Sequence, residues 1–201
     1  RDTLLALLRE RSIRFGDFVL ASGARSSYYV DCRPTTMSAI GQQVIGRLGL
    51  QAIRDAGWAP QAVGGLTMGA DPVAYAIAGA SADDRDRRSE NGDQRTHPPI
   101  SVLRSPISVV DAFSVRKSAK DHGTSRRIEG NFAAGMQVVV IEDVITSGGS
   151  ALEAIAAVRE AGGAVIGVLA VLDREAGGRE KIAASGVPVV TLTTASELGL
   201  L

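Results

Sequence analysis

The sequence has a single cysteine, no excess of either charge sign and no long apolar run. Because Cys32 is the only cysteine among 201 residues, no disulfide can form within the chain, and a buried thiol is expected. The 22 basic residues balance 22 acidic ones, so no overall field favours nucleic acid or an anionic membrane surface. No apolar stretch is long enough to span a bilayer, and none resembles a signal peptide. We therefore expect a cytoplasmic protein that binds neither membrane nor nucleic acid.

Two common nucleotide-binding motifs are also missing. The chain contains no G-x-G-x-x-G sequence, and no lysine stands where a Walker A loop requires one. These absences argue against a dinucleotide-binding domain and against an ATPase.

The hydrophobic residues that are present, 45% of the chain, suffice for one substantial core, so residues 1–201 are expected to form a single domain. Strand-like and helix-like segments alternate, which predicts an α/β fold with a mainly parallel sheet flanked by helices. Helices are expected from a cap at Asp2–Thr3, over 38–56 with Ile40 facing the core, over 72–80 and over 151–159. Strands are expected at 62–66, 108–115, 138–141 and 164–172, with an edge strand at 187–191 and a hairpin of 18–20 with 28–30.

The clearest pattern of strand, polar turn and helix begins at Val138. Four β-branched residues, Val138–Ile141, are typical of a strand buried on both faces of a parallel sheet. A turn and a segment with helical spacing follow, and the unpaired N–H groups and dipole at a helix start favour an anion. The stretch predicts a phosphate site formed by Thr146, Ser147, Gly148, Gly149 and Ser150. The alternative is an ordinary strand-to-helix connection with a serine or threonine cap.

An acidic pair, Glu142 and Asp143, stands directly before this turn, joined to it by Val144 and Ile145. Carboxylates repel a phosphate, so the pair needs another ligand. Two neighbouring acceptors suit the paired hydroxyls of a ribose, with a divalent cation nearby to offset the charge. The pair therefore favours a ribose-phosphate ligand over a simple anion.

Two polar segments interrupt the alternation of strands and helices. Residues 81–99 mix both charge signs, contain almost no apolar residue and are interpreted as a solvated insertion. Residues 114–130 carry Arg116, Lys117, Lys120 and His122 close together and lack apolar periodicity, which predicts a mobile basic loop facing a polyanion.

The run Ile141–Ser150 resembles the phosphoribosyl-diphosphate (PRPP) signature of the type I phosphoribosyltransferases. In that family the acidic pair holds the ribose hydroxyls and the turn holds the 5′-phosphate. The string from Val115 to Gly123 is similar to the catalytic loop of the members that act on orotate, and residues 1–35 resemble the small N-terminal hood over their base. An arginine follows a strand in those members, where this chain has Arg174, which would bind the carboxylate of orotate.

The resemblance implies a reaction, a metal and a partner. The phosphoribosyl group of PRPP would pass to orotate, giving orotidine 5′-monophosphate and diphosphate in pyrimidine biosynthesis, with Mg²⁺ carried by the donor and no metal site of the protein's own. Lys117, Lys120, His122 and Asp143 would be the catalytic residues. Arg116 would join the two lysines and His122 in neutralising the leaving diphosphate, while Asp143 would hold the ribose. The enzyme would be a homodimer whose loop reaches into the neighbouring site.

The chain departs from the family where many members have lysine, at Ala21 in the hood and Ala70 in the loop that meets diphosphate. Arg25 and Arg33 are the cations that could replace them. Two other functions stay open on the sequence: transfer to another base, such as a purine, and a regulator that binds PRPP without turnover.

Overall fold

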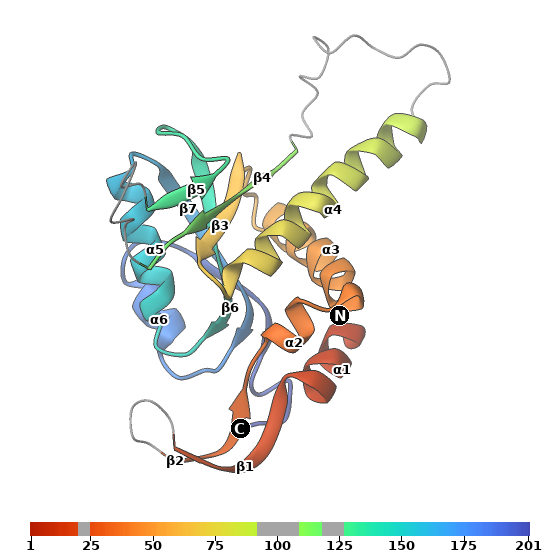
Figure 1. Cartoon of the computed structure of the whole chain (residues 1–201), viewed down its shortest axis with the longest axis vertical. Helices are drawn as coiled ribbons and strands as arrows, with labels where there is room; N and C mark the ends of the chain where they lie inside the picture. The colour runs from red at the N-terminus through yellow and green to blue at the C-terminus, as the bar shows by residue number, and fades with distance from the viewer. Residues whose placement is uncertain (20–24, 92–108, 118–126) are drawn as a thin grey trace.

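A six-stranded sheet forms the centre of the protein in this computed structural model, which describes residues 1–19, 25–91, 109–117 and 127–201 (Figure 1). The strand order is β5-β4-β3-β6-β7-β8, and every neighbouring pair is parallel except β4 with β5. The strands are β3 (Ala62–Leu66), β4 (Asp111–Val115), β5 (Ile128–Gly130), β6 (Gln137–Ile145), β7 (Ala164–Asp173) and β8 (Val189–Thr194). The predicted mainly parallel sheet is confirmed, and β8 is at an edge as expected, although the strand begins at Val189, after Pro188.

Helices cover both faces of this sheet because successive residues of each strand point to opposite sides. Val139 and Ile141 of β6 belong to one hydrophobic cluster, and Val138 and Val140 belong to the other. The first cluster packs against α1 (Asp2–Arg11), α3 (Ala39–Asp55) and α4 (Ala70–Asn91). The second packs against α5 (Gly149–Glu160) and α6 (Gly178–Ala183). Both faces are therefore buried, as the β-branched run predicts.

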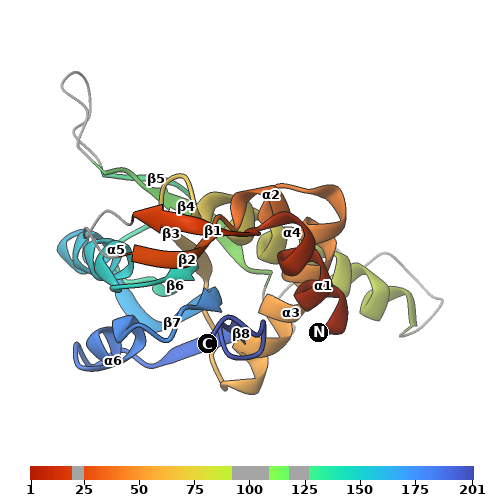
Figure 2. The ribbon, with the colours of Figure 1, turned by 90° about the horizontal axis from the view of Figure 1, so that it is seen from below.

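The N-terminal hairpin forms a separate two-stranded antiparallel sheet of β1 (Ile13–Val19) and β2 (Arg25–Val30), followed by the short helix α2 (Arg33–Thr36). Seen from below, the hairpin lies across the ends of the central strands (Figure 2). Its strands are longer than the sequence predicts. The hairpin therefore stands where it can cover a ligand at that end of the sheet.

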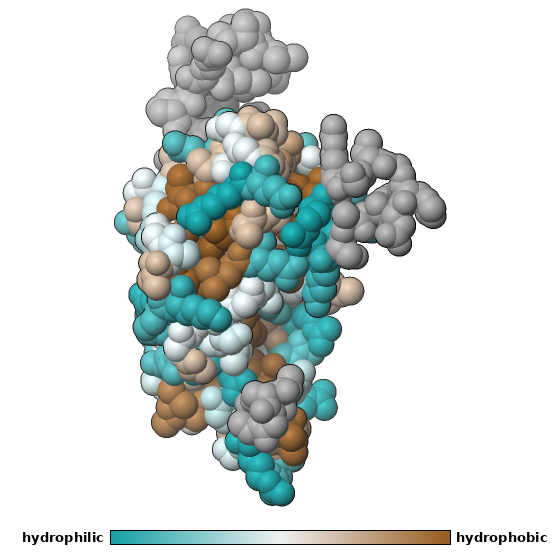
Figure 3. Space-filling view, turned by 90° about the vertical axis from the view of Figure 1, so that its left-hand side faces the viewer, coloured by the Kyte–Doolittle hydropathy of each residue, from teal (hydrophilic) through white to brown (hydrophobic). Residues whose placement is uncertain are grey.

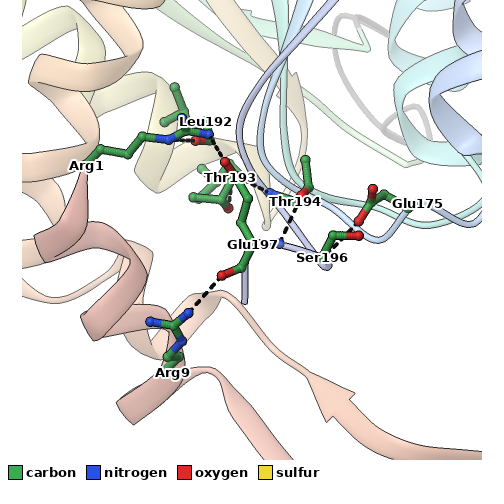
Figure 4. A network of polar contacts seen from close by, with 9 residues as sticks. Arg1, Arg9, Glu175, Leu192, Thr193, Thr194, Ser196 and Glu197 are labelled. Atoms are coloured by element: carbon green, nitrogen blue, oxygen red, sulfur yellow. Dashed lines mark hydrogen bonds and ion pairs between the residues drawn. The ribbon is translucent and has the colours of Figure 1, made fainter. Parts of the chain in front are cut away.

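A polar network holds the first helix against the C-terminal segment (Figure 4). Arg1 forms an ion pair with Glu197 and donates from Nε to the carbonyl of Leu192 at 3.3 Å. Arg9 donates to the backbone carbonyl of Glu197 at 2.8 Å, and the other Glu197 carboxylate oxygen accepts from the N–H of Thr194 at 3.0 Å. These bonds fix α1, and with it the start of the hairpin, to the end of β8.

Helix α4 runs to Asn91, so the prediction of a loop from Ser81 is wrong for residues 81–91. Tertiary contacts explain the extension. The buried Ser81 hydroxyl donates to the carbonyl of Ala78 at 2.7 Å and accepts from the N–H of Val110 at 3.0 Å. Asp84, one turn further on, pairs with Arg54 of α3 at 2.8 Å. Residues 92–99 of the predicted insertion lie outside the described residues.

Three smaller expectations have mixed outcomes. The predicted cap at Asp2–Thr3 is wrong, because the helix already includes Asp2 and its N-cap is Arg1. Ile40 is 54% exposed and does not face the core. Cys32 is fully buried, as expected for a packed thiol.

Among the described residues, no helix combines the length and apolarity that crossing a membrane requires. On the face drawn in Figure 3, hydrophobic residues form separate patches among hydrophilic ones.

Candidate functional site

A pocket of about 660 Å³ opens at the carboxyl ends of β3 and β6, beside the hairpin. Ligands collect at this edge of open parallel sheets. The lining residues are Tyr29, Val30, Asp31, Cys32, Arg33, Leu66, Thr67, Met68, Gly69, Lys117, Glu142, Asp143, Val144, Thr146, Ser150 and Arg174. Seven residues of the predicted site are thus gathered around one cavity: Lys117, Glu142, Asp143, Val144, Thr146, Ser150 and Arg174.

The acidic pair lies inside β6 and does not follow it. The strand continues to Ile145 because its pairing with β7 persists, with Glu142 opposite Ala170 and Ile145 opposite Asp173. Ile145 itself is buried in the core. The sheet thereby holds both carboxylates rigidly at the rim of the pocket.

Burial first, and then the charge of the neighbouring Asp143, raise the pKa of Glu142 to about 8. Burial also raises the pKa of Asp143, against the opposing effect of the Val144 N–H, which donates to its Oδ1 at 2.9 Å. Only 7% of Glu142 is exposed. One buried and one partly buried carboxylate side by side at a pocket are costly for the free protein, which is typical of groups that serve a ligand.

The glycine-rich turn presents its polar groups to solvent. Thr146, Ser147 and Ser150 are exposed, and α5 begins after Gly148 with no side-chain cap. A serine or threonine cap, the alternative weighed for this turn, is therefore not formed. Gly148 has φ +74°, and a Cβ there would lie 2.8 Å from the carbonyl oxygen of Gly178. Only glycine fits this turn, whose free N–H groups face an incoming anion.

A second loop, between β3 and α4, closes the pocket opposite the acidic pair. A Cβ on Gly69 would lie 2.6 Å from Oδ1 of Asp143, so the loop passes directly over that carboxylate. Ala70 is fully buried, and its Cβ lies 2.8 Å from where one on Gly65 would stand. In this backbone a lysine at Ala70 would enter the core and would not face the pocket. Ala21, the other departure from the family, lies outside the described residues.

Arg174 enters the pocket over an aromatic ring. Its guanidinium lies 5.0 Å from the ring centroid of Tyr28, which is 9% exposed. Its Nε is buried and has no hydrogen-bond partner among the described residues. An arginine stacked on one face and unpaired at its edge is free to bind a carboxylate. The sequence reasoning identified Arg174 but not Tyr28, because the contact joins segments far apart in the chain.

Arg33 also lines the pocket, where it donates to both carboxylate oxygens of Asp31 at 2.8 and 2.9 Å. The hydrogen bond from Arg33 lowers the pKa of Asp31. Arg25 instead pairs with Asp17 on the exposed hairpin surface. Of the two cations considered as replacements for the missing lysines, only Arg33 reaches the pocket.

The other predicted site residues within the described part of the chain do not line the cavity. Arg116 pairs with Glu129 of β5 at 3.3 Å. Ser147, Gly148 and Gly149 belong to the turn beside the pocket. Lys120 and His122 lie outside the described residues.

Replacing Glu142 with glutamine should stabilise the ligand-free protein, and more at pH 8 than at pH 5. The folded pKa of about 8 exceeds the ordinary value of 4.5. Between those values the folded state holds a proton that the unfolded chain has released, so the free energy of unfolding falls as pH rises. Glutamine carries no charge and removes this loss.

Thermal denaturation of both proteins across this pH range measures the effect, and Glu160→Gln on the exposed surface of α5 is the control. A difference between Glu142→Gln and wild type that does not grow with pH would contradict the assignment of a buried, protonated carboxyl.

Comparisons with known proteins agree with this geometry. The family description "Phosphoribosyl transferase domain" matches residues 37–187. The chain is 43% identical over its whole length to an orotate phosphoribosyltransferase of Corynebacterium glutamicum, covering 94% of that protein. It resembles the orotate phosphoribosyltransferase of Mycobacterium tuberculosis solved with Fe(III) dicitrate, with a TM-score of 0.76, 39% identity and 98% of each chain covered. A structure of the M. tuberculosis enzyme with PRPP gives a TM-score of 0.72 and 35% identity, again with 98% of each chain covered.

Proposed function

The chain belongs to the phosphoribosyltransferase family, and we propose that it transfers the phosphoribosyl group of PRPP to orotate, giving orotidine 5′-monophosphate and diphosphate in pyrimidine biosynthesis. The observation that carries the proposal is the shared pocket of Glu142, Asp143 and Arg174. Two acceptors and one unpaired guanidinium match a ribose and a carboxylate-bearing base.

The acidic pair and the turn hold the ribose-phosphate part of the donor. The Glu142 and Asp143 carboxylates accept from the ribose hydroxyls. The N–H groups at the start of α5 and the hydroxyls of Thr146 and Ser150 donate to the 5′-phosphate. Because the strand fixes the carboxylates and the helix fixes the turn, the ribose is held at both ends.

The diphosphate faces the loop 67–70 and Lys117. As the bond between C1′ and the diphosphate oxygen breaks, positive charge develops on the ribose and negative charge on the leaving group. Lys117 and, by family resemblance, Arg116, Lys120 and His122 from the loop of a neighbouring subunit neutralise the leaving group. His122 or Lys120 supplies a proton to it. The ring nitrogen of orotate then bonds to C1′ and releases its N–H proton to solvent.

Mg²⁺ would be carried by the diphosphate of the donor and would offset its charge. This hard cation prefers oxygen ligands, which the donor's own oxygens would supply, and Asp143, the less buried of the acidic pair, would stand beside them. Among the described residues, no cluster of three or more histidine, cysteine or acidic side chains could hold a metal.

Orotate consumption, followed with PRPP and Mg²⁺, tests the assignment. We expect turnover with orotate and at least about a hundredfold lower kcat/KM with adenine or guanine, since purines bring no carboxylate to Arg174. Turnover with a purine alone would establish the other-base alternative. PRPP binding without turnover of any base would establish the regulator.

A homodimer with a shared loop is the proposed assembly. It is supported by four large apolar residues that are 48–60% exposed. They lie on or next to α2, α3 and α4, and Nε2 of Gln42 in α3 joins α3 to α4 by donating to the carbonyl of Pro72 at 2.8 Å. Exposed large apolar side chains on linked segments fit burial by a second subunit. They are Met37, Ile40, Met68 and Tyr75.

Mixing two inactive variants, Lys120→Ala and Asp143→Asn, should restore activity if the loop acts in the neighbouring site. Each heterodimer then contains one site with both residues intact and one with neither. Random exchange makes half the dimers mixed, so about a quarter of wild-type activity should return. Native mass spectrometry checks that heterodimers form. Formed heterodimers without activity would refute the shared site.

A further inference from the structure

Asp71 joins the two segments that form the diphosphate side of the pocket. Its Oδ2 accepts a hydrogen bond from Oγ1 of Thr67, which lines the pocket. Its Oδ1 accepts from Oγ of Ser114 at 2.7 Å. Ser114 is in β4, three positions before Lys117, so one carboxylate links the loop after β3 to the start of the basic loop.

The donors in this network follow from chemistry. A carboxylate only accepts hydrogen bonds, so the Thr67 and Ser114 hydroxyls must both donate to Asp71. The Ser114 oxygen is then free to accept from the Tyr75 hydroxyl, which lies 3.2 Å away. The backbone adds a parallel link, because the N–H of Thr67 donates to the carbonyl of Val115 at 2.8 Å.

We propose that Asp71 is a positioning residue for the diphosphate of the donor, an inference that rests on the proposed function. Asp71 does not line the pocket. Its carboxylate acts through its neighbours: it holds Thr67 and Gly69 on one side and the approach to Lys117 on the other at a fixed separation. The rest of the site does not depend on this link, since Arg174 and the turn after β6 are held by other elements.

Asp71→Ala should therefore lower kcat/KM for PRPP by about 10- to 100-fold while KM for orotate stays within about threefold. The groups that it displaces face the diphosphate of PRPP and do not contact orotate. Asp71→Asn should recover most of the loss. Its amide oxygen accepts from one hydroxyl, and its NH₂ group donates to the oxygen of the other. Ser114→Ala removes one of the two hydrogen bonds to Asp71, together with the contact to Tyr75, and should fall between the two.

Asp83→Ala is the matched control, because Asp83 is an exposed aspartate of the same helix that does not line this pocket. Affinity for PRPP with Mg²⁺, measured by calorimetry, keeps the test independent of turnover. If the wild type binds PRPP but does not consume orotate, the proposed function fails and the affinities still decide the role of Asp71. Equal losses for both substrates, no loss, or failure of asparagine to rescue would overturn the proposal.

Discussion

Asp143→Asn should reduce turnover by about 100- to 1,000-fold, the range seen when a preorganised charge at a reacting centre is removed. The carboxylate lies at the pocket rim beneath Gly69 and next to the phosphate turn, where the ribose would develop positive charge. An amide of the same shape keeps an acceptor for a ribose hydroxyl but loses the negative charge. The loss should therefore fall on kcat with saturating PRPP more than on binding.

The fold should survive this change. The N–H of its own neighbour, Val144, donates to the Asp143 side chain, and the amide oxygen of asparagine can accept this bond too. Since burial raises the pKa of Asp143, removing its charge should leave the melting temperature unchanged or higher. Asp111→Asn is the control, because Asp111 is exposed and lies at the amino end of β4, at the edge of the sheet away from the pocket. Near-normal turnover at saturating donor would contradict the ribose assignment.

Local chemistry made the centre of this site predictable from sequence. The β-branched run before Glu142 marks a buried strand, and polar residues after such a strand must lie at the carboxyl edge of a parallel sheet. The same reasoning placed Arg174 at that edge. The structure gathers these side chains in one pocket. The polar side chains that meet at the strand ends can therefore be predicted, because each follows its strand within a few residues.

Element boundaries were less predictable because tertiary contacts set them. The sequence predicted that the strand would end at Ile141, before the acidic pair, yet pairing with β7 continues it to Ile145. The charged segment after Ala80 was predicted to be a loop, yet it is helical, and the contacts of Ser81 and Asp84 stabilise the helix there. Local propensity is a weak signal when such contacts are available.

Contacts between distant segments were beyond sequence reasoning altogether. The sequence around Tyr28 does not show that its ring packs against Arg174. The sequence around Asp71 does not show that Ser114 donates to it. Both contacts depend on how the hairpin and the strands pack. They are also what turns isolated polar residues into a site of defined shape.

Arg174→Ala should weaken orotate far more than PRPP. In the proposed complex only orotate brings a carboxylate to this guanidinium, and losing one partner of a desolvated charged pair costs roughly 2–5 kcal/mol. This corresponds to a rise in KM for orotate of about 30-fold or more. KM for PRPP should change by less than about threefold, because the acidic pair and the turn hold the donor independently.

Two variants separate binding from packing. Arg174→Lys keeps the charge but loses the bidentate geometry and the flat stack on Tyr28, so it should recover only part of the affinity. Arg179→Ala removes an exposed arginine of α6 that does not line the pocket and should change neither KM. Initial rates across both substrate concentrations measure all of these constants. Equal weakening of orotate and PRPP by Arg174→Ala would show that Arg174 supports the structure and does not select the base.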